Sequence, residues 1–546
     1  MSLNKEDEGK YIRMGWWLNI TLGDMLDKAA ELCPDKEALV DDRSRLTYAQ
    51  LRDKTDRLAI GFIKLGIKKG DYVLLQLPNW NEFIYAFFAL HKIGAPAVLL
   101  LSRHMQVEIN HLCSLTKAKV WIVPESYRNT DYLPVINDVK RTNPHIQQII
   151  SVRPKGKSSF IELEELIRDV DLNNENIGEL SRSKPDATEV AFVLATGGTT
   201  GLPKAVPRTH NSAVCEAKYK AIAREQDNND VCLVSVPLEH NLGLAAVNST
   251  IFSFGKIILL DSTKPEDLCL TVQQEKVTCA PIVPALLSRL VTFGGLGNYD
   301  LSSLKALYVG GAKTPTEIIQ AVYEKIGNVY VGAFGMSEGP TCTTRLDDDP
   351  EIIFNAIGKP CCPHDEFKTV DESGRKVPSN TEGELLAKGP GVFSGYLHNP
   401  EENKRVFTKD GFFRTGDLAI IDDAGNVKIT GRIKDVIIRG GENISPAEIE
   451  SLISTHPDVA DVAVVGMPDK ELGERACAYV KPHGKAKPTL EGIVSFLKSR
   501  GASVLQLPER VELIDNIPLT NIGKADKKVL REDINKRLDD PHTPSM

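Results

Sequence analysis

The sequence predicts an α/β fold built on parallel sheets, and two patterns lead to that prediction. Apolar runs of strand length, such as 71–77 and 95–101, alternate with segments of helical periodicity, such as 81–94 and 106–118. The runs are apolar on both faces, which is typical of a parallel sheet covered by helices on both sides. Further runs of this kind lie at 119–124, 189–195, 255–260, 279–284 and 306–311. The N-terminal part of the chain therefore predicts one large α/β body.

The character of the chain changes after Glu382. Short strands separated by turns rich in Gly and Asp predict antiparallel structure there. From Ser445 to Leu538 the pattern reads as helix, strand, strand, helix, strand, which predicts a small α+β domain. The boundary falls near 431–435, so we expect an N-terminal domain at 1–433 and a C-terminal domain at 434–546.

Composition limits the classes of function. The 546 residues exceed a single core, and 42% apolar residues with a net charge of −8 indicate a soluble globular protein without a broad nucleic-acid surface. The N-terminus lacks the apolar region of a signal peptide, and the most apolar stretch, 83–101, is broken by His91-Lys92 and by Gly94-Ala95-Pro96. We therefore expect a cytoplasmic protein without a membrane span. Ten scattered cysteines with no C-x-x-C predict buried, reduced thiols.

One stretch spells the nucleophile motif of a hydrolase. Gly335-Met336-Ser337-Glu338-Gly339 matches G-x-S-x-G, in which the serine stands on a strand–turn–helix elbow. The following residues do not have a helical pattern, and the downstream histidines lie in segments that suggest no Asp…His pair. A serine hydrolase using Ser337 therefore remains only a remote alternative.

A second stretch has the composition of a phosphate-binding loop. It follows the apolar run 189–195 and combines glycines, which let backbone N–H groups approach an anion, with hydroxyl donors and a lysine. Its spacing differs from that of a Walker A loop. The residues that we expect to contact phosphate are Thr196, Gly197, Gly198, Thr199, Thr200, Gly201 and Lys204.

This loop, "TGGTTGLPK", resembles that of the adenylate-forming superfamily, which includes acyl- and aryl-CoA ligases, adenylation domains of peptide synthetases and luciferases. Four more motifs follow in the order that the family shows: "GMSEG" at 335–339, "RTGD" at 414–417, "GRIKDVIIRGGENISPAEIE" at 431–450 and "PLTNIGKADKKVLR" at 518–531. The resemblance implies a large N-terminal domain of doubly wound sheets with a distorted β-barrel region, which binds ATP and the acid. It also implies that the small C-terminal domain is mobile.

The resemblance implies a reaction in two halves. A carboxylate attacks the α-phosphate of ATP, pyrophosphate leaves, and a thiol then displaces AMP from the acyl-adenylate. Because the first half brings anions together, cations are needed around them. The catalytic residues would be Glu338, which would hold Mg²⁺, together with Lys204 and Lys524, the latter bridging the carboxylate and the α-phosphate.

Further roles follow from the same resemblance. Asp417 would accept hydrogen bonds from the ribose hydroxyls, with Arg432 beside it. The adenine would lie between the turn Gly310-Gly311-Ala312 and the aromatic ring of Phe334. Gly335, Met336 and Ser337 would complete the ATP site. Lys434 would be the hinge between the domains, and the thiol step would use Gly440, Gly441, Glu442 and Asn443.

The carboxylate pocket resembles that of relatives that activate hydroxybenzoates for siderophores, since it contains His240-Asn241. Ala245-Ala246 departs from the serine of those enzymes, so a ring hydroxyl would lack a partner there. The expected pocket residues are His240, Asn241, Ala246, Gly310 and Pro340.

We expect an AMP-forming ligase that joins a compact, aromatic or cyclic acid to CoA. The alternative is a stand-alone aryl-acid-AMP ligase, of the 2,3-dihydroxybenzoate type, that loads a carrier protein. A luciferase-like oxygenase stays open, whereas a non-catalytic nucleotide-binding protein would be expected to have lost Lys524, Glu338 or Asp417. Monomer and homodimer are both compatible with the sequence.

Overall fold

Two large sheets form the body of the computed structural model, which describes residues 5–196, 202–439, 442–469, 472–500, 502, 506–520 and 524–539. The first sheet has nine strands, in the spatial order β18 (Lys359–Pro360), β17 (Thr341–Thr343), β16 (Tyr330–Gly335), β15 (Ala306–Gly310), β14 (Cys279–Ile282), β12 (Val231–Val234), β13 (Lys256–Leu259), β1 (Glu37–Val40) and β2 (Arg45–Thr47). The second has seven, in the order β11 (Lys204–Thr209), β10 (Val190–Thr196), β4 (Ala97–Leu99), β3 (Val73–Leu75), β5 (Val120–Pro124), β8 (Gln148–Val152) and β9 (Ile161–Glu162).

Helices fill the space between these sheets and cover their outer faces. The largest apolar core contains residues of both sheets and of α2 (Leu22–Leu32), α3 (Tyr48–Lys64), α4 (Asn81–Lys92), α9 (His210–Ala223) and α10 (Asn241–Phe252). The outer face of the nine-stranded sheet packs against α11 (Pro265–Glu275), α12 (Pro284–Thr292) and α13 (Thr316–Lys325). That of the seven-stranded sheet packs against α5 (Gln106–Thr116) and α6 (Leu133–Thr142). The predicted α/β class is therefore confirmed.

The predicted strands lie where the apolar runs indicated, although the strands are shorter than the runs. The run 71–77 contains β3 at 73–75, and the run 95–101 contains β4 at 97–99. The pairs β3–β4, β3–β5, β5–β8 and β10–β4 are all parallel, as the runs predicted.

The strands on either side of Glu382 are antiparallel, but they do not form a barrel. Their four-stranded sheet has the order β19 (Glu366–Val370), which lies before Glu382, then β20 (Gly383–Lys388), β21 (Phe413–Ile421) and β22 (Val427–Arg432). Within the described residues β19 and β22 are the two edges and do not pair with each other. The expected distorted β-barrel is therefore corrected to an open sheet.

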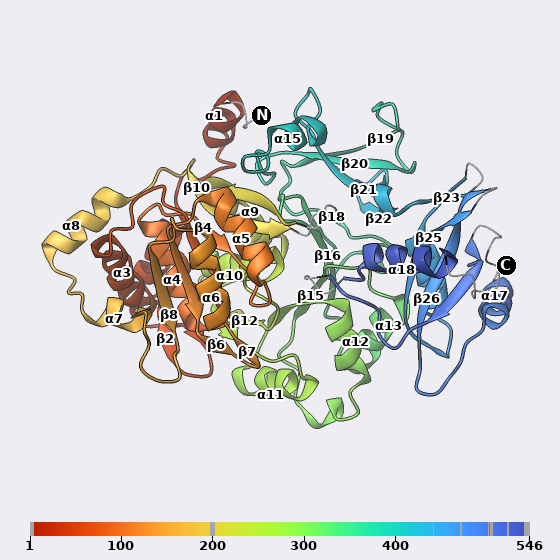
Figure 1. The fold of residues 1–546 in the computed structure, drawn as a ribbon, viewed down its shortest axis with the longest axis horizontal. Helices are drawn as coiled ribbons and strands as arrows, with labels where there is room; N and C mark the ends of the chain where they lie inside the picture. Colours follow the sequence, from red (N-terminus) through yellow and green to blue (C-terminus); the bar gives the residue numbers. More distant parts are fainter. Residues whose placement is uncertain are drawn as a thin grey trace.

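The described residues of the C-terminal part form a five-stranded sheet and three helices, and Figure 1 places them, in blue, at the opposite end of the molecule from α3 and α8. Its elements are β23 (Ile437–Arg439), β24 (Glu442–Ile444), α16 (Pro446–Ile453), β25 (Val459–Asp469), β26 (Gly473–Pro482), α17 (Leu490–Ser499), β27 (Arg510–Leu513) and α18 (Lys527–Asp539). The predicted order from Ser445 onward is confirmed, with α18 as an additional helix.

The remaining elements connect or flank these layers. They are α1 (Lys5–Arg13), β6 (Ser126–Tyr127), β7 (Thr130–Asp131), α7 (Leu163–Arg168), α8 (Asn174–Ser183), the 3₁₀ turns η1 (Leu296–Asn298) and η2 (Ile433–Asp435), α14 (Pro350–Asn355) and α15 (Pro400–Val406). Among the residues described, no helix is both long and apolar enough to cross a membrane. All ten cysteines are free thiols; nine are buried and Cys33 is half-buried.

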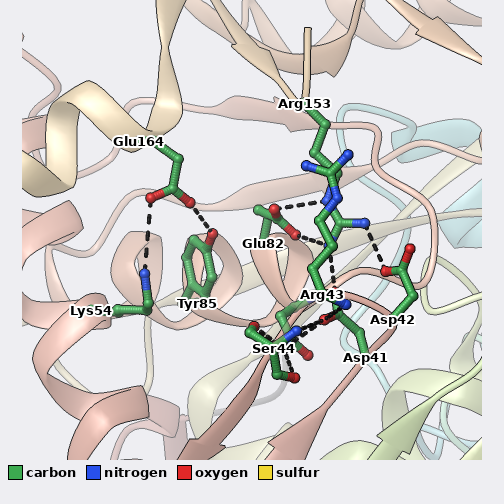
Figure 2. A network of polar contacts seen from close by, with 10 residues as sticks. Asp41, Asp42, Arg43, Ser44, Lys54, Glu82, Tyr85, Arg153 and Glu164 are labelled. Carbon is green, nitrogen blue, oxygen red and sulfur yellow. Dashed lines mark hydrogen bonds and ion pairs between the residues drawn. The ribbon is translucent and has the colours of Figure 1, made fainter. Parts of the chain in front are cut away.

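A buried cluster of charges joins the two large sheets (Figure 2). Arg153, which follows β8, donates through Nε and Nη2 to the two carboxylate oxygens of Glu82 on α4, at 2.8 Å each. Its guanidinium also pairs with Asp41, which follows β1, and lies 4.4 Å from the ring centroid of Trp80. The side chains of Arg153, Asp41 and Glu82 are only 5%, 1% and 9% exposed. Burial raises the pKa of Glu82, and the hydrogen bonds and charge of Arg153 oppose this shift, so the guanidinium favours the ionised carboxylate.

Replacing Arg153 by alanine would leave buried carboxylates without their cation. We expect Arg153→Ala to lower the free energy of unfolding by about 3–5 kcal/mol. Arg128→Ala is the matched control, because Arg128 pairs with Asp261 while 60% of its side chain is exposed, and it should cost at most about 1 kcal/mol. Urea unfolding followed by tryptophan fluorescence measures both, and equal shifts would contradict the role of the buried cluster.

Candidate active site

The phosphate loop connects two paired strands. Thr196, at the end of β10, lies directly opposite Lys204, at the start of β11, so the two strands that flank the loop are an antiparallel pair. The Nζ of Lys204 forms an ion pair with Glu402 on α15 and lies 4.7 Å from the ring centroid of Tyr396. The expected phosphate contacts Gly197, Gly198, Thr199, Thr200 and Gly201 lie outside the described residues.

Glu338 and Ser337 lie in a tight turn between β16 and β17, which are antiparallel. Gly339 completes the turn with φ +110°, and a Cβ there would lie 2.0 Å from the carbonyl oxygen of Gly391, so no other residue fits. Because the turn joins two strands and leads into no helix, the hydrolase elbow is absent. The carbonyl oxygen of Ser337 accepts a hydrogen bond from Arg208 Nη1 at 3.2 Å.

A segment that we did not single out from the sequence supports this turn. The hydroxyl of Tyr396 donates to Oε1 of Glu338 at 2.8 Å, and the backbone N–H of Phe393 donates to the carbonyl oxygen of Glu338 at 2.7 Å. Glu402, which pairs with Lys204, also pairs with Arg405 at 2.7 Å. Residues 393–405 therefore hold both the phosphate-loop lysine and the acidic residue. In the sequence, the local signal for this segment is Gly395-Tyr396, a glycine next to an aromatic residue. In the structure, Gly395 has φ +128°.

Asp417 and Arg432 form a pair across β21 and β22. Arg432 Nε donates to Oδ1 of Asp417 at 2.7 Å, and the two residues are directly opposite in the strand register. Asp417 is 2% exposed, and its Oδ2 is buried with no hydrogen-bond partner among the described atoms. Desolvation raises its pKa despite the charge of Arg432. A buried carboxylate oxygen without a partner is an acceptor ready for a ligand hydroxyl, as expected for a ribose site.

Lys524 reaches this site from the C-terminal part of the chain. It lies beside the bridge between Leu519 and Ala525, and its carbonyl oxygen accepts from the N–H of Thr520 at 2.6 Å. Although part of the residue is exposed, desolvation lowers the pKa of its ammonium to about 8, followed by repulsion from Arg432; Asp417 and Glu338 act in the opposite direction. The charges of Asp417 and Glu338 therefore act on the Lys524 ammonium.

The expected pocket residues His240 and Asn241 begin α10. Asn241 Nδ2 donates to Oε1 of Glu216 at 3.0 Å and to the carbonyl oxygen of Met336 at 3.2 Å. Because both partners are acceptors, they fix the orientation of the amide and leave Oδ1 as the acceptor. Burial lowers the pKa of His240 to about 4, so its imidazole is neutral at pH 7, and its Nε2 is buried without a partner in the described part of the chain.

Glu216, which the sequence analysis missed, anchors the amide of Asn241. It pairs with Lys220 at 2.6 Å and with Arg208 at 3.2 Å. All three charges lie on or next to α9 and are buried. Lys220 and Arg208 offset the desolvation of the Glu216 carboxylate and lower its pKa. No signal in the sequence marked this cluster, because Glu216 and Lys220 read as ordinary charged residues of a helix and Arg208 lies on the preceding strand.

The other expected residues divide into those near this site and those not described. Gly310 ends β15 opposite Ala333, and a Cβ on it would lie 3.1 Å from the Ala333 carbonyl oxygen. Gly311 and Ala312 follow in an exposed turn, Phe334 and Met336 are half-buried, and Gly335 is exposed. Ala246 and Pro340 are buried.

Lys434 lies in η2, and burial lowers its pKa. Gly440 and Gly441 lie outside the described residues, as do the side chains of Glu442 and Asn443.

Comparison with known proteins assigns the family. The model of the AMP-binding enzymes matches residues 26–397, more than half of the chain, and the model of the C-terminal domain of AMP-binding enzymes matches residues 448–524. The chain therefore belongs to the AMP-binding enzyme family and is an adenylate-forming ligase.

Individual relatives span almost the whole chain. It is 37% identical to the 2,3-dihydroxybenzoate-AMP ligase of Bacillus subtilis (strain 168), over 97% of this chain and 96% of that protein. It is 34% identical to a salicylyl-CoA synthase / salicylate adenylyltransferase of a Streptomyces species, over 98% and 97%. The structure of Mycobacterium smegmatis MbtA without ligand superposes with a TM-score of 0.73 at 33% identity, over 97% of this chain and 98% of the other.

The family uses ATP with Mg²⁺, and the residues around Glu338 fit such an ion. Across the described ranges no three or more His, Cys, Asp or Glu residues gather in a way that could hold a metal. Mg²⁺ commonly takes only one or two protein carboxylates and completes its shell with substrate phosphates and waters. Glu338, in a glycine-bounded turn that shares the Tyr396 and Glu402 segment with the phosphate-loop lysine, is suited to that role. The bound ion would neutralise phosphate charge.

Removing the hydroxyl that orients Glu338 should weaken the ATP half-reaction. We expect Tyr396→Phe to lower acid-dependent ATP–pyrophosphate exchange by about 10-fold or more, as the loss of one charge-assisted hydrogen bond does, and to raise the Mg²⁺ concentration at half-maximal rate. Tyr85→Phe is a matched control, because the hydroxyl of Tyr85 donates to Glu164 at 2.8 Å in the Figure 2 cluster. An unchanged Mg²⁺ dependence in Tyr396→Phe would show that the hydroxyl does not serve the metal.

The low pKa of Lys524 predicts a pH dependence. A lysine is charged below its pKa, so with a pKa of about 8 the cation is lost as pH rises through 8. We expect kcat/KM for ATP in the exchange reaction to fall above about pH 8, approaching about tenfold per pH unit, since this parameter reports the free enzyme. Lys524→Arg should move that fall to higher pH at a lower rate. Lys527 lies three residues after Lys524 and pairs with Glu450, so Lys527→Arg should leave the pH profile unchanged. A fall at the same pH in wild type and both variants would assign the fall to another group.

Proposed function

We propose that the protein is a stand-alone aryl-acid-AMP ligase that activates an aromatic carboxylic acid with ATP and passes the acyl group to the thiol of a carrier protein. The observation that supports the proposal is the hydrogen bond from the amide of Asn241 to Met336 in the Glu338 turn, beside the electrostatic influence of Glu338 and Asp417 on Lys524.

In the first half-reaction, a carboxylate oxygen of the acid forms a bond to the α-phosphorus of ATP, and the bond to pyrophosphate breaks. Lys524 would contact both the acid and the α-phosphate and neutralise the charge that repels them. Lys204 would leave Glu402 for the phosphates, and Asp417 Oδ2 would accept from the ribose. In the second half-reaction, a thiolate attacks the acyl carbon and AMP leaves with the electron pair of the broken bond.

The orientation of Asn241 supports a particular substrate class. With Nδ2 held by two acceptors, its Oδ1 is left as an acceptor, and it would select acids with a hydrogen-bond donor next to the carboxylate, such as a 2-hydroxyl or 2-amino group. Ala246 offers no polar side-chain atom to a second ring hydroxyl. Both named relatives act, according to their names, on 2-hydroxybenzoates. We therefore favour a salicylate-type acid over 2,3-dihydroxybenzoate.

The acceptor is the point on which the sequence-based expectation changes. That expectation placed CoA first, whereas the more similar named relative is an AMP ligase, and only the other is named for CoA. These comparisons favour the aryl-acid-AMP ligase, with transfer to CoA as the second candidate.

The experiment is ATP–pyrophosphate exchange with benzoate, salicylate, 2-aminobenzoate, 2,3-dihydroxybenzoate and a fatty acid, followed by AMP release with CoA and with a phosphopantetheinylated aryl carrier domain. Exchange with 2-substituted benzoates and AMP release only with the carrier domain supports the proposal. AMP release driven by CoA would select the second candidate. Exchange with the fatty acid alone would overturn the substrate class.

A selective prediction tests the role of Asn241. We expect wild type to prefer salicylate over benzoate in kcat/KM by about 10-fold or more, because a buried acceptor without its donor is costly. Asn241→Ala should reduce that ratio toward one. The ratio is informative even if the substitution disturbs Glu216, since general disruption lowers both rates together. An unchanged ratio in Asn241→Ala would show that another residue recognises the ring substituent.

A further inference from the structure

Ser445 occupies the N-cap position of α16, but its side chain does not cap the helix. It precedes α16 with extended backbone angles, and its side chain makes no hydrogen bond to the helix. A serine at this position usually accepts a hydrogen bond from one of the first free N–H groups of the helix. Here its Oγ donates instead to the carbonyl oxygen of Thr430, at 2.7 Å.

This hydrogen bond spans the expected hinge. Thr430 lies in β22, before Lys434, whereas Ser445 lies after it, at the start of the C-terminal domain. Gly431 permits the approach, because a Cβ there would lie only 3.3 Å from the Ser445 hydroxyl oxygen. Arg531, on α18, donates to the carbonyl oxygen of Lys434 and to Asp435, at 3.2 Å each, and so holds the hinge peptide to the C-terminal side. The Ser445 hydroxyl acts in the other direction, toward the body.

We propose that Ser445 is a positioning residue that holds the C-terminal domain in the arrangement that presents Lys524 to Asp417 and Glu338. The inference rests on the proposed function, in which the domain serves two half-reactions. Rotation at Lys434 would break the bond to Thr430, and the freed hydroxyl would then cap α16. One hydrogen bond is exchanged for another, so the two arrangements stay close in free energy. The binding of a substrate can then shift the protein from one arrangement to the other.

Two substitutions at Ser445 separate its two partners. Aspartate is a strong capping acceptor but cannot donate to Thr430, so Ser445→Asp should favour the second arrangement. Alanine removes both partners, so Ser445→Ala should shift the balance less. Thr489 provides the matched control, because it precedes α17 in the same domain and does cap its helix, accepting from Gly492 N–H at 3.1 Å. Thr489→Asp and Thr489→Ala change a cap without touching the hinge.

The first readout is the ratio of two rates, ATP–pyrophosphate exchange and thioester formation from supplied aryl-adenylate, with the acceptor that wild type uses. We expect this ratio to fall by about 3- to 10-fold in Ser445→Asp, the effect of one hydrogen bond, and by less in Ser445→Ala. Both Thr489 variants should keep the wild-type ratio. A Ser445→Asp ratio equal to those of the Thr489 variants would overturn the proposal, as would a larger fall in alanine than in aspartate.

The second readout needs no turnover, so it separates this inference from the proposed function. Spin labels at Lys404 on α15 and Lys498 on α17, both exposed, report the distance between body and C-terminal domain in a Cys33→Ser background, since the other nine cysteines are buried. Ser445→Asp should increase the population of a second distance, whereas Thr489→Asp should not. Identical distance distributions would refute the positioning role of Ser445, whatever acid the enzyme uses. A shifted distribution in a protein that activates no aryl acid would support that role and reject only the proposed function.

Discussion

The site depends on charges that are held by one another before any ligand arrives. Lys204 pairs with Glu402, Asp417 pairs with Arg432, and Glu338 accepts the hydroxyl of Tyr396. Desolvation raises the pKa values of Glu338 and Asp417, whereas the Tyr396 hydroxyl at Glu338 and the Arg432 cation at Asp417 act in the opposite direction and favour the ionised carboxylates. An ionised group in such a place is tolerated only with a partner, and these partners also fix its direction. ATP and its metal ion would therefore meet groups that are already oriented.

The topology explains why these groups can meet. Thr196, Gly310 and Gly335 end β10, β15 and β16, and His240 lies in the segment that follows β12. The carboxyl ends of parallel strands are where open α/β sheets bind ligands. Here the two sheets contribute together, because Ser102, after β4, donates through its N–H and its hydroxyl to Glu239, beside His240. Burial raises the pKa of Glu239 to about 7, so this link lies in a protected position between the sheets.

Local patterns and motifs predicted much of this arrangement, but not the contacts that support it. The runs 71–77 and 95–101 indicated β3 and β4 because burial on both faces demands apolar residues at every position. Asp417 and Lys524 were predicted through their motifs, and in the structure each charge acts on the other. Glu216 was missed although Lys220 lies one helical turn away, because a charged pair at that spacing is ordinarily found on an exposed helix face. Tyr396 and Glu402 were missed because their partners Glu338 and Lys204 lie far away in the chain. The expected barrel was wrong in detail for the same reason, since closure depends on which strand edges meet.

Two kinds of connection would allow a rigid body and the proposed movement of the C-terminal domain in one chain. Within the body, Arg153 holds both sheets through buried pairs with Asp41 and Glu82, and breaking such pairs is expensive. Across the hinge, the Ser445 hydroxyl contributes a single hydrogen bond to a carbonyl oxygen, the kind of contact worth about 0.5–1.5 kcal/mol. If the C-terminal domain presents Lys524 in one half-reaction and withdraws it in the next, as we propose, the two arrangements need similar free energies, because a strongly favoured one would hinder the other step. Strong, buried charge pairs suit the scaffold of the site, whereas a weak, replaceable bond suits the domain that has to leave it.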